Sequence, residues 1–110
     1  MSKIKYDILL PKSQEQLENI FQSLLKSVKS KHIIIKILEN YINLDVLSGI
    51  LNKYQIQIEK FKRNQSLVIL TDSFDYEKIP DFIPVAPTEE EALDIIDFEI
   101  IERDLSIPEN

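Results

Sequence analysis

The chain has 110 residues, the length of one ordinary domain, and a formal net charge of -6. It contains no cysteine and one glycine, which excludes disulfides, thiolate metal sites and the glycine-rich loops that cradle phosphate groups. Its first residues are too charged for a signal peptide and no apolar stretch could span a membrane, so we expect a cytoplasmic protein. The charge is uneven, since residues 1–71 carry 11 basic and six acidic side chains, whereas residues 72–110 carry two and 13.

The first two predicted elements are a strand and an amphipathic helix. Alternating apolar residues predict a strand over residues 3–10, ended by Pro11. Ser13 stands three residues before Gln16, which is a capping box and predicts a helix start. The apolar stripe of this helix advances in steps of three and four residues through Leu17, Ile20, Phe21, Leu24, Leu25 and Val28.

The middle of the chain predicts a buried strand and a long helix. The nearly continuous β-branched run over residues 33–38 is typical of a strand that helices cover on both faces. A polar loop over residues 39–43 follows, and apolar steps of three and four then predict a helix over about residues 44–61. The alternative is a break near Tyr54 followed by a strand, because apolar residues also alternate after it.

The last third predicts two strands and a final helix. Residues 67–70 form another buried strand, and residues 72–80 a loop or a single helical turn. Residues 82–85 predict a short strand, which contains a proline and therefore belongs at a sheet edge. Thr88 begins a second capping box, and the helix that follows is expected to end at about residue 104.

Strands that alternate with helices in this way require crossover connections. We therefore expect one α/β domain over residues 1–110, with a mostly parallel four-stranded sheet, crossover helices and disorder confined to the last few residues.

The order and length of these elements resemble a STAS domain, the fold of the anti-sigma-factor antagonists. The resemblance is carried by Ile33 to Leu38 before the switch loop, Tyr41-Ile42-Asn43 in the loop, Leu67 to Leu70, and Thr88-Glu89-Glu90-Glu91-Ala92-Leu93 at the closing helix. It implies a non-catalytic protein-binding module in bacterial regulation, whose partner is an anti-sigma or other regulatory protein. By the same resemblance, the partner surface includes Tyr41, Asn43, Leu44, Asp45 and Ser48.

One departure from that family concerns its phosphorylation switch. Switching members carry a phosphorylatable serine just after an aspartate at the helix start, where this chain has Asn43 and Leu44. The resemblance thus implies the fold without the usual switch.

The end of the chain also resembles a group of short bacterial proteins with the pattern "VVPT…EA.DII…ERDL", some of which carry the label ribonuclease Z. The corresponding residues are Val85-Ala86-Pro87-Thr88, Glu91-Ala92, Asp94-Ile95-Ile96 and Glu102-Arg103-Asp104-Leu105. That activity requires a two-metal cluster with several histidines, and this chain has one histidine, so we do not expect it.

The final helix carries two apolar stripes where one would suffice to cover a sheet. One stripe, which includes Ile96, is expected to face the sheet. The second comprises Phe98, Ile101 and Leu105. Either the segment through Ile107 folds back over the second stripe, or the stripe is a homodimer or partner surface.

Other candidate sites are weaker. His32 lacks the neighbouring residues that a catalytic nucleophile or a metal-ligand set needs. We therefore expect His32 to be a structural residue at the edge of a strand. Acidic residues on one face of the last helix could bind a cation or a basic partner, although a solvated face is the more ordinary explanation. The basic cluster at residues 60–63 lacks interleaved aromatics, which disfavours nucleic acid. We therefore expect no cofactor and no enzyme; the alternative to protein binding is a small-ligand or nucleotide-binding module.

Overall fold

The computed structural model describes residues 4–26, 31–72 and 76–105. Its described elements, in chain order, are β1 (Tyr6–Leu9), α1 (Gln14–Gln22), the 3₁₀ turn η1 (Leu24–Lys26), β2 (His32–Lys36), α2 (Leu44–Lys53), α3 (Gln55–Phe61), β3 (Leu67–Leu70), the 3₁₀ turn η2 (Tyr76–Lys78), β4 (Val85–Ala86) and α4 (Glu89–Leu105). The expectations for Val28 and for disorder at the end of the chain concern residues outside these ranges.

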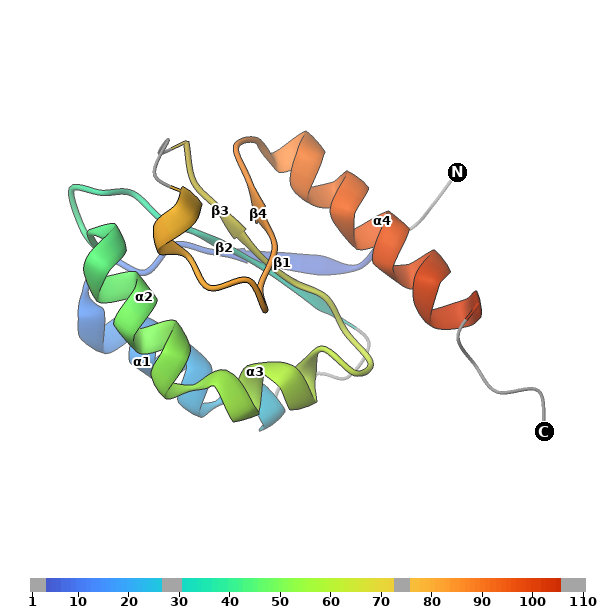
Figure 1. Ribbon diagram of the computed structural model, residues 1–110, viewed down its shortest axis with the longest axis horizontal. Coiled ribbons are helices and arrows are strands. Elements are labelled where there is room, and N and C mark those ends of the chain that lie inside the picture. The colour runs from blue at the N-terminus through green and yellow to red at the C-terminus, as the bar shows by residue number, and fades with distance from the viewer. Residues whose placement is uncertain (1–3, 27–30, 73–75, 106–110) are drawn as a thin grey trace.

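The four strands form one parallel sheet in the order β1-β2-β3-β4. Each strand after β1 therefore pairs with the strand before it, and successive right-handed crossovers place their helices on the same face. Figure 1 shows α1, α2 and α3 on that face and α4 on the opposite one. The expected parallel α/β architecture is confirmed.

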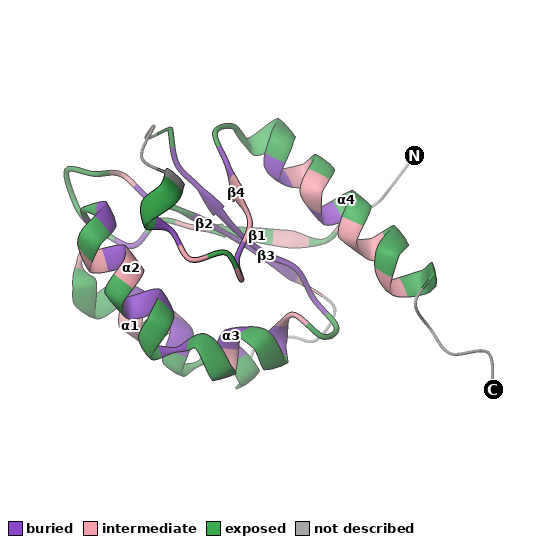
Figure 2. Cartoon of the chain, in the orientation of Figure 1, coloured by how far each residue is buried: buried purple, intermediate pink, exposed green. Residues whose placement is uncertain are grey.

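Alternation along the strands divides the core into two halves. In β2, Ile33 and Ile35 pack against the first three helices, whereas Ile34 packs toward α4. Leu67 and Ile69 of β3 repeat the first pattern, and Val68 and Leu70 the second. Within the described residues, the larger core therefore lies under the three helices α1 to α3, and the smaller one under α4 (Figure 2).

Both predicted capping boxes begin helices. The hydroxyl of Ser13 accepts a hydrogen bond of 3.1 Å from the N–H of Gln16, and the side chain of Gln16 accepts one of 2.8 Å from the N–H of Lys12. The hydroxyl of Thr88 accepts a bond of 3.2 Å from the N–H of Glu91. These bonds satisfy backbone donors that a helix leaves unpaired in its first turn.

The prediction of one helix over residues 44–61 is wrong, because the helix breaks at Tyr54. The ring of Tyr54 stacks on Phe21 of α1 at 5.8 Å, and its hydroxyl donates a bond of 3.0 Å to Glu18. These contacts coincide with the break, and a second helix, not the alternative strand, follows it.

The last strand also differs from its prediction, since β4 starts at Val85 instead of residue 82. Pro84 has no N–H and contributes only its carbonyl, which accepts a bond of 3.0 Å from the N–H of Ile69. Regular pairing therefore begins after the proline, with Val85 opposite Ile69 and Ala86 opposite Leu70.

Candidate functional site

The outer face of α4 carries an exposed apolar row. Phe98, Ile101 and Leu105, which we call the α4 stripe, have exposed fractions of 62%, 53% and 80%. Ala92 and Ile96 on the same helix are fully buried against the sheet. The helix is thus apolar on both sides, and only one side packs within the described part of the chain (Figure 2).

Acidic side chains surround the α4 stripe. The helix contains eight acidic residues and one basic residue. Asp94 and Glu102 are each four residues from Phe98, so they lie on the same side of the helix as the stripe. Asp97 stands in the same relation to Ile101. The surface therefore combines apolar contact area with a strong negative field.

The alternative that the segment through Ile107 covers the stripe concerns residues outside the described ranges. The spacing predicted that the three residues share one side of α4, and within the described ranges that side is exposed. Its role as a partner surface stays a prediction.

The residues predicted around the start of α2 form a separate surface on the opposite layer (Figure 1). Asn43 caps α2, with its side-chain oxygen accepting a bond of 2.8 Å from the N–H of Val46. Asp45 is exposed and lies 3.6 Å from Lys78 of η2. Tyr41 is exposed, and Ser48 is half-buried. The α4 stripe and the residues around the start of α2 are thus two separate candidate surfaces, on opposite faces of the sheet.

Leu44 requires a correction. Its side chain is only 2% exposed and belongs to the larger core, so it is not available to a partner at the surface. Asn43 caps the helix, and Leu44, the first residue of α2, packs inward against the core. A substitution of Leu44 by a charged residue would test folding, not binding.

A polar cluster beneath α4 anchors the second half of that helix. Arg103 donates a hydrogen bond of 3.1 Å to the hydroxyl of Ser66, the residue before β3. The backbone N–H of Ser66 donates to Nδ1 of His32 at 2.9 Å. Burial, followed by the positive charge of Arg103, lowers the pKa of His32, against an opposing effect of Glu99. His32 is therefore a buried structural residue. As predicted, it stands at the start of a strand, β2.

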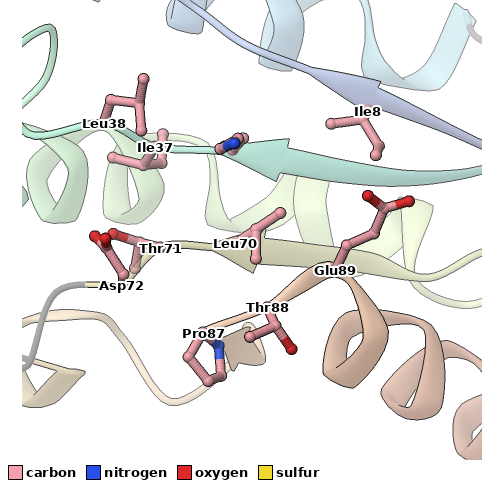
Figure 3. A pocket seen from close by; sticks show the side chains of 10 residues that line it. Ile8, Ile37, Leu38, Leu70, Thr71, Asp72, Pro87, Thr88 and Glu89 are labelled. Carbon is pink, nitrogen blue, oxygen red and sulfur yellow. The ribbon is translucent and has the colours of Figure 1, made fainter.

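A cavity of about 340 Å³ opens at the carboxyl ends of the strands. Figure 3 shows it between β1, the ends of β2 and β3, and the start of α4. Ile8 and Leu70 contribute apolar walls, whereas Lys36, Asp72 and Glu89 contribute charges. Sequence reasoning missed this site. The available signal was Lys36, a cation directly after a run of three isoleucines.

Glu89 is tied across the cavity mouth to the first strand. The hydroxyl of Tyr6 donates a bond of 2.8 Å to one carboxylate oxygen of Glu89. This bond raises the pKa of Tyr6, because ionisation would place two negative charges together. This bond joins the side chain of Glu89, at the start of α4, to Tyr6 of β1.

Among the described residues, no three histidine, cysteine or acidic side chains are placed to share a metal ion. No described helix has the length and apolar character needed to cross a bilayer. No family model, curated protein or solved structure gives a significant match to the chain.

Proposed function

We propose that this chain is a non-catalytic protein–protein interaction module, a STAS-like domain of bacterial cytoplasmic regulation, and that it binds its partner through the α4 stripe. The exposure of Phe98, Ile101 and Leu105 is the observation that carries the proposal. Contiguous large apolar side chains on a surface helix favour a contact surface, because their exposure opposes solubility. The polar surface at the start of α2 offers one exposed aromatic, Tyr41, and therefore less burial energy.

The partner we propose is a different protein that presents an amphipathic helix with basic side chains beside an apolar row. The acidic character of α4 favours this basic partner over a second copy of the chain. A second copy seated on the same face would bring two strongly acidic helices together and leave Asp94, Asp97 and Glu102 opposed by like charges. A basic helix gains contact with the stripe and also neutralises its acidic surroundings.

The STAS-like assignment is supported by the alternation of strands and helices. The absence of the usual phosphoserine switch is supported by Leu44, which occupies the phosphorylated position, has no hydroxyl and is buried. Regulation would therefore depend on the presence of the partner and not on phosphorylation at that position.

Two designed helical peptides of equal length test the partner chemistry. Both carry the same leucine row, and the remaining positions are lysine in one and glutamate in the other. We expect the lysine peptide to bind, to shift the amide NMR signals of residues 94–105, and to weaken as salt is added. The glutamate peptide should not bind.

A matched pair of substitutions separates contact from general attraction. Phe98→Ser should reduce the affinity for the lysine peptide about tenfold or more. Ile56→Ser, which changes an exposed isoleucine on α3, should leave it unchanged. Equal binding by Phe98→Ser and the parent chain would overturn the proposal. So would a homodimer in sedimentation that Phe98→Ser dissociates, because a second copy would then occupy the stripe.

A further inference from the structure

The cavity at the carboxyl ends of the strands follows from the strand order. Among the described elements, the crossover helices lie on one face, and α4 is the one helix on the other. A helix is about 10 Å wide and neighbouring strands are about 4.8 Å apart, so one helix covers roughly two strands. Helix α4 packs mainly on β3 and β4. The α4 side of β1 and the end of β2 therefore stay open, and Ile8 remains 40% exposed.

The register determines which side chains line this opening. Ile8 pairs with Ile34, and Lys36 pairs with Leu70. Because side chains alternate along a strand, Lys36 points to the same face as Ile34 and lines the cavity. The floor thus places one cation next to the apolar side chains of Ile8 and Leu70.

Two carboxylates stand at opposite ends of the cavity. Figure 3 shows Glu89 near Ile8, and Asp72 beyond Thr71. Glu89 is already oriented by the hydroxyl of Tyr6. Lys36 forms no ion pair with another residue in the described ranges. The cavity therefore offers a cation beside an apolar floor and one carboxylate at each end.

We infer that this cavity binds a small zwitterion, an α-amino acid with an apolar side chain. Its carboxylate would pair with Lys36, its ammonium group with Glu89, and its side chain would lie on Ile8 and Leu70. The volume of about 340 Å³ lies at the small end of ligand pockets, as expected for a ligand of this size.

A nucleotide fits the same cavity less well. Three glutamates fill the first turn of α4, where a phosphate would otherwise meet backbone N–H groups. The lone glycine, Gly49, lies in α2, away from the cavity. Phosphate would therefore face repulsion from Glu89 without a glycine-rich loop to receive it.

Three small probes test the inference by amide NMR titration of the full chain. L-leucine carries both charges, isoamylamine lacks the carboxylate, and isocaproate lacks the ammonium group. We expect L-leucine at millimolar concentrations to shift the amides of residues 8, 36–38, 70–72 and 88–89, and each analogue to bind about tenfold more weakly. Equal binding of isoamylamine would show that Lys36 has no part, and no shift with L-leucine would also refute the inference.

Variants assign the two charges. Lys36→Met should remove the preference for L-leucine over isoamylamine, whereas Lys60→Met, on the opposite layer, should preserve it. Glu89→Gln retains an acceptor for Tyr6 and should remove the preference over isocaproate. Unchanged preferences in both cavity variants would overturn the assignment. Tighter binding of adenosine monophosphate at the same amides would replace the amino acid with a nucleotide.

Discussion

The backbone N–H of Ser66 donates a hydrogen bond of 2.9 Å to Nδ1 of His32, 34 residues earlier in the chain. A ring nitrogen that accepts a hydrogen bond carries no proton, so neutral His32 holds its proton on Nε2. Protonation of Nδ1 would set two N–H groups against each other inside the protein. This bond fixes the spacing between the starts of β2 and β3.

Stability should therefore fall as the solution is acidified through the range in which this histidine titrates. Burial lowers the pKa of folded His32 below its ordinary value of 6.5, so the unfolded chain binds more protons between those two values. The free energy of unfolding then rises with pH across that window and levels off above it. Urea denaturation between about pH 7.5 and 5.5 measures the slope. His32→Asn keeps an acceptor but cannot titrate there, and a slope equal to that of the parent chain would contradict the assignment.

The charges beside His32 should shift its pKa in opposite directions. Arg103→Gln removes a positive charge and should raise the pKa of His32, whereas Glu99→Gln removes a negative charge and should lower it further. Because the chain has one histidine, NMR titration of the imidazole signals follows this residue without overlap. Shifts in the same direction for both variants would be inconsistent with a direct electrostatic effect.

Gly49→Ala should stabilise the protein. Gly49 lies inside α2 and has no positive φ angle, and beyond its chain neighbours and the adjacent backbone of α2 no atom would come within 4 Å of an added Cβ. Alanine in a helix interior is favoured over glycine by about 0.5 to 1 kcal/mol, because the unfolded chain loses less backbone freedom on folding. Urea denaturation should show this increase in the free energy of unfolding. The increase should be smaller for Gly49→Val, because a β-branched residue loses rotamer freedom in a helix. A destabilised alanine variant would mean that the site is more crowded than it is in this structure.

The two faces of α4 should respond differently to truncation. Ile96→Ala should lower the free energy of unfolding by about 2 to 5 kcal/mol, because Ile96 is fully buried against the sheet. Phe98→Ala should change it by about 0.5 kcal/mol or less, because most of the Phe98 side chain is exposed. Thermal or urea unfolding of the two variants measures the contrast. A large decrease in the free energy of unfolding for Phe98→Ala would indicate that the segment after α4 packs on the α4 stripe.

Local patterns in the sequence predicted most of the elements. The isoleucine run of β2 and the caps at Ser13 and Thr88 depend on neighbouring residues, and the structure confirms all three. The break at Tyr54 was only an alternative, with a strand expected after it, because Ile50, Tyr54 and Ile58 continue the helical spacing across the break.

Features that depend on distant segments could not be predicted. The spacing of Phe98, Ile101 and Leu105 predicted a second stripe, but not its exposure. The cavity depends on which strands α4 covers, and the bond between Ser66 and His32 depends on how two strands start side by side. No local pattern contains that information.

The position of α4 has a consequence for biosynthesis. Each strand after β1 pairs with one made earlier, so the strands and the three-helix layer can assemble in the order of their synthesis. The second face, with Ile34, Val68 and Leu70, stays bare until residues 89–105 have left the exit tunnel. Until α4 packs, this apolar sheet surface is open to chaperones and to neighbouring nascent chains.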